Sequence, residues 1–362
     1  MNSLNIMVHR RRFLKASAAL AAVSALPAWF VEESRSYAAP AKPLSPNDKP
    51  GIALVGCGGQ GTGDCNWASN FGNVIAVCDL DEKHLETAAT HFKAPHKYRD
   101  FRQVMERDDV HVIITGTPDH WHTMVNLAAV KAGKDIYSEK PLTLAIDEGK
   151  RLVAAVKEHG TVFQTGSQQR SDPRFRLACE LVRNGRVGKL QQIYSVLPTG
   201  PREGPFDPLP VPFELNWDFY LGQAPYFAYN GHNAHFNFRW WYRFSGGMMT
   251  DWGAHHDDIA QWGNGTERSG PVEVEGKSLI DMIPGGYNTA ARYEVNFKYA
   301  NGVRLTVLDD QTHHLENGVK FEGTEGWIFV NREKIQASKP ELLDEPLPSG
   351  AIRLYKSDNH MG

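Results

Sequence analysis

A glycine-rich segment between an apolar run and a helical pattern limits the fold of this chain more than any other feature. Gly56-Cys57-Gly58-Gly59-Gln60-Gly61 is a complete G-x-G-x-x-G that directly follows the apolar run Ile52–Val55. In a strand–loop–helix unit the first glycine permits a tight turn, the second lets the backbone approach a pyrophosphate, and the third lets the helix pack closely on the strand. The segment therefore predicts a dinucleotide-binding loop containing Gly56, Gly58, Gln60 and Gly61.

An acidic residue follows the next apolar run, Val74–Cys78. Asp79 stands where a carboxylate accepts hydrogen bonds from the hydroxyls of an adenosine ribose. Asp81 repeats the negative charge, and no arginine adjoins Asp79. Because a 2′-phosphate would face this charge, the pattern favours NAD over NADP.

Strand and helix patterns alternate from Gly51 to about Gly166, which is typical of a parallel sheet covered by helices on both faces. The predicted strands are Ile52–Val55, Val74–Cys78, Val112–Thr115, Asp135–Tyr137 and Val162–Thr165. The predicted helices include His84–Phe92, Thr123–Ala132 and Ile146–His159, the last ending before Gly160. We therefore predict an α/β fold whose first domain, residues 51–168, is a doubly wound Rossmann sheet.

The pattern changes in the second part of the chain, residues 169–362, which predicts an α+β domain with an antiparallel sheet. Two helices are expected, at Phe175–Asn184 and near Asp251–Trp262. The expected strands are Leu190–Leu197, Ala291–Tyr299, Val303–Leu308, Val319–Glu322, Trp327–Val330 and a strand-like Ile352–Tyr355. Asn301-Gly302 is a tight-turn signal between two of them.

The N-terminus carries an export pattern. Arg10–Lys15 contains R-R-x-F-L-K, followed by the apolar run Ala16–Val31 and a small-residue site at Ser36–Ala38. The pattern predicts a twin-arginine signal at residues 1–38 and a linker at 39–50, with an uncleaved membrane anchor as the alternative. Twin-arginine export carries folded proteins, and the periplasm has no soluble nicotinamide pool. The export machinery is thus an expected partner, and a periplasmic enzyme would have to keep its cofactor tightly bound.

Composition excludes some classes of protein. The net charge is −3, and no Lys/Arg run follows the signal, which argues against nucleic-acid binding. The four cysteines form no disulfide framework. Several histidines stand in close pairs, but no H-E-x-x-H or similar spacing occurs, so we predict no metal site.

Two polar segments follow predicted strands at the edge where open α/β sheets bind ligands. Thr117-Pro118-Asp119-His120 follows Val112–Thr115, and Glu139-Lys140-Pro141 follows Asp135–Tyr137. A lysine held in this cleft could polarise a substrate hydroxyl and lower its pKa. The alternative for Lys140 is a surface side chain paired with Glu139.

A carboxylate and an imidazole share one face of a predicted helix. Asp251 and His255 are four residues apart, and Asp258 continues their face. An imidazole can take an alcohol proton near neutral pH, and a carboxylate one turn away can orient it. The alternative is an aspartate that stabilises the helix N-terminus beside an incidental histidine.

The segment Phe206–Phe244, hereafter the aromatic segment, concentrates Phe, Trp and Tyr residues. Aromatic rings suit the C–H faces of sugars, and polar neighbours could bind hydroxyls: Asn230, Asn233, Asn237, Arg239 and Arg243. The alternative is an aromatic dimer or domain interface.

Taken in order, the motifs resemble the glucose–fructose oxidoreductase, inositol dehydrogenase and rhizopine-catabolism family (Gfo/Idh/MocA), in its exported branch. They are V-G-C-G-G-Q-G at Val55–Gly61, C-D-L-D at Cys78–Asp81, T-P-D-H-W-H at Thr117–His122, E-K-P at Glu139–Pro141, G-S-Q-Q-R at Gly166–Arg170, F-R-W-W at Phe238–Trp241 and G-G-M-M-T-D-W-G-A-H-H-D-D at Gly246–Asp258. The resemblance implies a Rossmann domain, then an α/β domain with an open antiparallel sheet. It also implies a catalytic set of Lys140, Asp251 and His255.

Further site residues are expected around that set. Beyond the glycine loop and Asp79, the expected cofactor contacts are Thr117, Pro118, His120, Glu139 and Lys140. The expected substrate contacts are Arg170, Arg239, Trp240, Trp241 and His256. Family members usually extend beyond the point where this sequence ends, so part of the second domain is expected to be missing.

These observations predict an NAD-dependent oxidoreductase that moves a hydride between a sugar or polyol carbon and a tightly bound nicotinamide. His255 would take the hydroxyl proton, Lys140 would stabilise the alkoxide, and Asp251 would orient His255 or hold a neighbouring hydroxyl. A homo-oligomer is expected. One alternative is an NAD-dependent glycosidase that works by transient oxidation and elimination. The other is a non-catalytic sugar-binding protein with a structural dinucleotide.

Overall fold

The structure is a computed structural model that describes residues 26–31 and 49–357. The predicted twin-arginine motif at Arg10–Lys15 and the cleavage site at Ser36–Ala38 lie outside these residues. Within the described ranges, every helix is too short or too polar to span a bilayer.

The first domain is built on a six-stranded sheet in the order β3-β2-β1-β4-β5-β6, with every neighbouring pair parallel. The strands are β1 (Gly51–Val55), β2 (Asn73–Cys78), β3 (His96–Tyr98), β4 (Val112–Thr115), β5 (Asp135–Ser138) and β6 (Phe163–Thr165). The strand order reverses between β1 and β4, which is where such sheets bind ligands. The predicted Rossmann sheet is therefore confirmed, while β3, a short polar strand, was not predicted.

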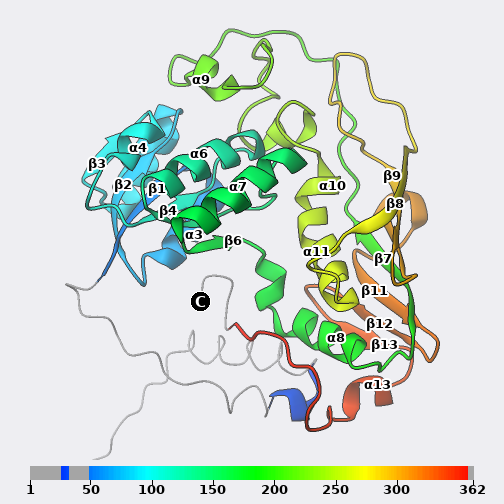
Figure 1. Cartoon of the computed structure of the whole chain (residues 1–362). Helices are drawn as coiled ribbons and strands as arrows, with labels where there is room; N and C mark the ends of the chain where they lie inside the picture. The colour runs from blue at the N-terminus through cyan, green and yellow to red at the C-terminus, as the bar shows by residue number, and fades with distance from the viewer. Residues whose placement is uncertain (1–25, 32–48, 358–362) are drawn as a thin grey trace, which may run out of the picture.

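Helices cover both faces of this sheet (Figure 1). Ile52 and Leu54 of β1 pack with α3 (Gly59–Ala68) and α4 (Glu82–Phe92). Ala53 and Val55 point to the other face, which carries α5 (Phe101–Met105), α6 (Asp119–Lys131) and α7 (Ile146–His159). All five residues of β1 are buried, as expected of a parallel strand with helices on both sides.

The second domain contains a seven-stranded sheet in the order β13-β12-β11-β7-β10-β9-β8. Its strands are β7 (Leu190–Leu197), β8 (Pro271–Ser278), β9 (Tyr293–Tyr299), β10 (Arg304–Asp309), β11 (Gly318–Gly323), β12 (Trp327–Val330) and β13 (Ile335–Ala337). The sheet is antiparallel except for one parallel pair, β7 with β10. Helices α8 (Pro173–Arg183) and α11 (Gly253–Asn264) pack on it through buried side chains such as Leu181 and Ile259.

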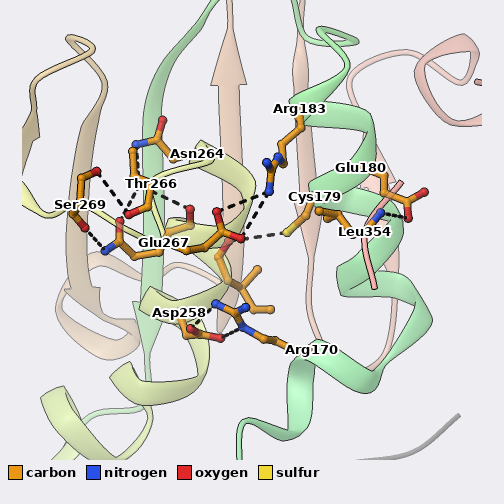
Figure 2. Close-up of polar contacts among 12 residues, drawn as sticks. Arg170, Cys179, Glu180, Arg183, Asp258, Asn264, Thr266, Glu267, Ser269 and Leu354 are labelled. Atoms are coloured by element: carbon orange, nitrogen blue, oxygen red, sulfur yellow. Dashed lines mark hydrogen bonds and ion pairs between the residues drawn. The ribbon is translucent and has the colours of Figure 1, made fainter. Parts of the chain in front are cut away.

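Three expectations for the second domain need correction. The strands β8 and β13 were not predicted, because β8 is almost entirely exposed and β13 has only three residues. The predicted helix near Asp251–Trp262 is two helices, α10 (Met248–Asp251) and α11, which meet at Trp252. The strand expected at Ile352–Tyr355 is wrong. That segment lies against α8, where the Leu354 N–H donates to Glu180 Oε1 at 3.0 Å (Figure 2).

The aromatic segment folds back onto the Rossmann domain. It contains α9 (Trp217–Leu221) and the 3-10 helix η3 (His235–Trp240). Backbone hydrogen bonds join it to the end of β2, from Glu82 N–H to Glu214 O at 3.1 Å and from Asn216 N–H to Leu80 O at 3.2 Å. Many of its rings form a separate core: Trp217, Tyr220, Phe238, Trp240, Trp241 and Phe244. The segment thus serves as a domain interface, the alternative to a purely sugar-binding role.

Candidate active site

A cavity of about 510 Å³ lies between the carboxyl ends of the Rossmann strands and the aromatic segment. One side of the cavity is formed by the Rossmann domain, through the glycine loop, Asp79 and the segments after β4 and β5. The other side is formed by the aromatic segment, through Leu215, Phe219 and Tyr220. Eight of the expected cofactor residues line it: Gly56, Gly58, Gln60, Asp79, Thr117, Pro118, Glu139 and Lys140. The cavity therefore occupies the position that sheet topology assigns to a dinucleotide.

The glycines have separate structural requirements. Gly56 has a φ of +92°, and a Cβ there would lie 2.5 Å from the carbonyl carbon of Gly116. A Cβ on Gly61 would lie 2.2 Å from Gly56 O, because α3 packs tightly on the loop. A Cβ on Gly58 would have no neighbour within 4 Å, so open space lies above the backbone at this position. These are the three features that a pyrophosphate-binding loop needs.

Asp79 is held in place at the end of β2. Its Oδ2 accepts the Cys57 N–H at 2.6 Å, and its Oδ1 accepts the Asp81 N–H at 2.8 Å. Burial raises the pKa of Asp79, while these two N–H groups act in the opposite direction. Among the described residues, Arg239 is the only arginine that lines the cavity, and it is paired with Asp251. Asp79 therefore presents a fixed carboxylate at the wall of the cavity.

A buried ion pair lies at the other end of the cavity. Lys140 Nζ, from the segment after β5, is 2.6 Å from Asp251 Oδ1 at the end of α10. Arg239 Nε of η3 is 3.5 Å from Asp251 Oδ2. The nearby cations hold the pKa of Asp251 below its ordinary value, although burial opposes them. Lys140 is thus a cleft residue that pairs with Asp251 rather than a surface partner of Glu139.

His255 lies in the first turn of α11, close to this ion pair. Its side chain is buried, and its Nδ1 has no hydrogen-bond partner. Burial, together with the positive charges of Lys140 and Arg332, lowers the pKa of His255 to about 2. The imidazole is therefore neutral at physiological pH, as a proton acceptor must be.

Glu139 and Asp64 lie together beneath the glycine loop. Gln60 Nε2 donates to Asp64 Oδ1 at 2.9 Å and approaches Glu139 Oε1 at 3.5 Å. Burial, reinforced by the charge of Asp64, raises the pKa of Glu139 to about 8. Glu139 is therefore protonated in much of the folded protein at neutral pH.

This raised pKa predicts a pH effect on stability. A carboxyl whose folded pKa is raised contributes stability below its ordinary pKa of about 4.3, and the contribution is lost as the pH rises through about 8. We expect Glu139→Gln to unfold at a higher temperature than the parent at about pH 9, with a smaller difference at about pH 5. Thermal unfolding of nucleotide-free protein measures this. Glu158→Gln, an exposed position on α7, is the control, and equal pH profiles for parent and Glu139→Gln would contradict the prediction.

Several expected site residues are not among those that line the cavity. His120 is fully buried, and its Nε2 hydrogen-bonds to Tyr220 O at 2.9 Å, so it joins the two domains. His256 is also buried, and its ring nitrogens contact Gln169 and Asn317. Arg170 forms a bidentate ion pair with Asp258 at 2.6 and 2.7 Å (Figure 2), so each of these two side chains has the other as its charged partner.

The remaining aromatic candidates are separated by the fold. Trp241 belongs to the core of the aromatic segment and donates its indole N–H to His232 O at 2.7 Å. Trp240 lines a second cavity of about 700 Å³ in the second domain. Phe236 lines both cavities, so the two spaces are neighbours.

Two residues of the cofactor-side motif were not assigned a role from the sequence. Asp119 begins α6 and lines the cavity, where burial raises its pKa to about 7. His122 hydrogen-bonds to Thr117 O at 2.7 Å and to Pro141 O at 2.8 Å, which connects the segments after β4 and β5. The T-P-D-H-W-H motif contains both residues, but only the fold shows what they contact.

Three family models match the sequence. Residues 51–167 match an oxidoreductase family with an NAD-binding Rossmann fold, and residues 202–352 match the C-terminal alpha/beta domain of an oxidoreductase family. Residues 7–27 match the signal sequence of the twin-arginine translocation pathway.

Curated relatives and solved structures agree with these matches. Myo-inositol 2-dehydrogenase of Thermotoga maritima is 24% identical over 84% of this chain and 81% of its own length. Levoglucosan dehydrogenase of Pseudarthrobacter phenanthrenivorans is 26% identical over 71% of this chain and 65% of its own length. A levoglucosan dehydrogenase complex with NADH has a TM-score of 0.62 at 22% identity, covering 80% of this chain and 76% of that one. The WlbA dehydrogenase of Bordetella pertussis, solved with NADH and UDP-GlcNAcA, has a TM-score of 0.63 at 18% identity. The match covers 83% of this chain and 79% of that one.

Proposed function

The chain belongs to the Gfo/Idh/MocA oxidoreductase family, and we propose that it oxidises a hydroxyl carbon of a sugar or polyol with tightly bound NAD as hydride acceptor. The observation that carries the proposal is the ion pair of Lys140 and Asp251 at the end of the dinucleotide cavity, with the neutral His255 nearby. Relatives named as inositol and levoglucosan dehydrogenases support a carbohydrate substrate.

Each residue of this set has a proposed task. His255 takes the proton of the substrate hydroxyl on its neutral imidazole. The Lys140 ammonium stabilises the oxygen as negative charge develops on it. Asp251 holds Lys140 and Arg239 in position through its two ion pairs. It is therefore a positioning residue, and it positions Lys140 more directly than His255. When bound, NAD supplies the acceptor for the hydride.

We also propose that the enzyme works in the periplasm with a captive cofactor. The twin-arginine match supports export of the folded protein, and we assign residues 1–38 to the signal and 39–50 to the linker. The aromatic segment contributes to the wall of the dinucleotide cavity, which supports slow exchange of the nucleotide. Within one turnover cycle, a second sugar, a ketone or an electron carrier would have to remove the hydride.

Identification of the bound nucleotide tests this proposal. Protein purified from the periplasm is denatured, and any released nucleotide is identified by mass spectrometry. We expect about one NAD or NADH per chain, and addition of sugars and polyols should then convert bound NAD to NADH. Release of free sugar from glycosides with no net change in the cofactor would instead favour the glycosidase. Protein that contains no nucleotide and does not bind added NAD would contradict both.

The charge of Asp79 predicts the choice of cofactor. Asp79→Asn keeps an oxygen that can accept the Cys57 N–H but removes the negative charge. Because like charges in contact are strongly unfavourable, we expect affinity for NADP relative to NAD to rise by about tenfold or more. Titration of nucleotide-free protein with each dinucleotide measures the ratio. The exposed Asp108→Asn is the control, and an unchanged ratio in Asp79→Asn would show that the carboxylate does not discriminate.

A further inference from the structure

Three metal-binding side chains meet at the adenosine end of the dinucleotide cavity. Asp81 and His84 come from the start of α4, whereas His235 comes from the aromatic segment. Each offers one ligand atom, and these atoms all lie within 4.8 Å of one another. His84 and His235 also line the cavity. Sequence spacing did not predict this cluster, because its two histidines are on different domains.

We propose that Asp81, His84 and His235 bind one divalent transition-metal ion of the Zn²⁺ type. Two imidazoles and a carboxylate form a common donor set for such ions, with a fourth position left for water. Ligand bonds of about 2.0–2.1 Å in a tetrahedral site place neighbouring ligand atoms about 3.3–3.5 Å apart. His235 Nε2 is already 3.4 Å from Asp81 Oδ2.

Hydrogen bonds orient the carboxylate for this role. Asp81 Oδ1 accepts the N–H groups of Lys83 at 2.8 Å and His84 at 3.3 Å, which caps α4. Its Oδ2 faces His235 instead. A ligand whose other oxygen is fixed by backbone donors needs little rearrangement to bind an ion.

The surrounding charge also favours a cation. Asp79 Oδ2 lies 4.0 Å from His84 Nδ1, so a second carboxylate stands behind this histidine. Lys83, the nearest lysine in sequence, is paired with Glu214. Among the ion pairs of the described chain, Asp79 and Asp81 have only histidine partners. The two carboxylates, Asp79 and Asp81, therefore lie beside the two imidazoles with no lysine or arginine paired to them in the described chain, an arrangement that a divalent ion would complement.

The location suggests what the ion would do. Asp81 and His84 belong to the Rossmann domain, and His235 belongs to the aromatic segment that packs over the cavity. A bound ion would therefore connect the two across the adenosine end and slow the escape of the nucleotide. This effect rests on the proposed function, whereas the metal site itself does not.

A zinc titration tests the site without any cofactor. The nucleotide-free chain is treated with a chelator, dialysed, and titrated with ZnCl₂ in competition with a chromophoric chelator. We expect one ion per chain, with affinity more than about tenfold lower in His84→Ala and in His235→Ala. His91→Ala is the matched control, because His91 lies on the same helix and contacts Asn66 outside the cluster. The side chains of His84 and His235 are 37% and 42% exposed, so both variants should fold, and circular dichroism checks this.

Cobalt provides a second measurement. Co²⁺ in place of Zn²⁺ should give visible absorption bands of a four-coordinate site in the parent and in His91→Ala but not in the two cluster variants. Equal Zn²⁺ affinity in the parent and in both cluster variants would mean adventitious metal binding only, and would overturn the proposal. Neither measurement requires dehydrogenase activity. The metal-binding result can therefore be interpreted even if the proposed function is wrong.

The effect on the nucleotide is tested separately. Protein loaded with NAD is diluted with Zn²⁺ or with chelator, and release is followed over time. We expect release to be several-fold slower with Zn²⁺ in the parent and independent of Zn²⁺ in His235→Ala. Release that is equally fast under both conditions in the parent would overturn the proposed link across the cavity.

Discussion

Replacing Lys140 by alanine is expected to lower the rate of hydride transfer by about a thousandfold while NAD remains bound. The ammonium lies at the end of the dinucleotide cavity, 2.6 Å from Asp251, and is the cation proposed to face the reacting oxygen. Arg239 stays 3.5 Å from Asp251 in the variant, so the carboxylate is not left without a cation and the fold should persist. Single-turnover measurement of NADH formation reports the rate, and mass spectrometry reports the nucleotide content.

Two comparisons make this result specific. Lys150→Ala removes an exposed lysine from α7 and should leave the rate unchanged. His255→Ala should also reduce the rate by at least about a hundredfold, because it removes the proposed proton acceptor. If both Lys140→Ala and His255→Ala react at the parental rate, the catalytic assignment is wrong, whatever the nucleotide content.

Replacing Gly61 by alanine is expected to cause the largest loss of nucleotide binding. The added Cβ would lie 2.2 Å from Gly56 O, a backbone atom of the same loop, so helix and loop must separate. We expect a loss of at least about 2 kcal/mol in the free energy of unfolding and protein that is purified without nucleotide. Chemical unfolding and mass spectrometry measure the two effects.

Gly63→Ala is the matched control, since it lies on the same helix, two residues away. A Cβ on Gly63 has no neighbour within 4 Å, so alanine should stabilise α3 by up to about 1 kcal/mol. The two substitutions are chemically identical and are expected to act in opposite directions. Similar stability and nucleotide content in both variants would show that close packing of α3 on the loop is unimportant.

Local patterns predicted the Rossmann domain well because its signals extend over only a few residues. Helix α7 was predicted with its observed bounds, Ile146–His159, from apolar periodicity and from Gly160, which ends it with a φ of +66°. The strands β4 and β7 were also predicted with their observed bounds. The exposed edge strand β8 has only a short apolar alternation, at Val272 and Val274, and pairing with β9 is what makes it a strand.

Long-range pairing explains why the site was only partly predictable. Lys140 and Asp251 could each be named from the sequence, but their contact joins residues 111 positions apart. The same is true of Arg170, an expected substrate contact, whose ion pair with Asp258 joins residues 88 positions apart (Figure 2). Which charged partner a side chain finds depends on how the helices pack, and that is not encoded within a few neighbouring residues.

Four features could be identified from the residues alone: the dinucleotide loop, the parallel sheet behind it, the acidic residue after β2 and the export signal. Each of them depends on local conformation or on a short motif. Three other features appear only in the folded chain: Asp251 lies between Lys140 and Arg239, the side chains of His120 and His256 are buried, and His235 meets Asp81 and His84. These contacts form between distant segments, and they follow from the packing of two domains and the aromatic segment against one another.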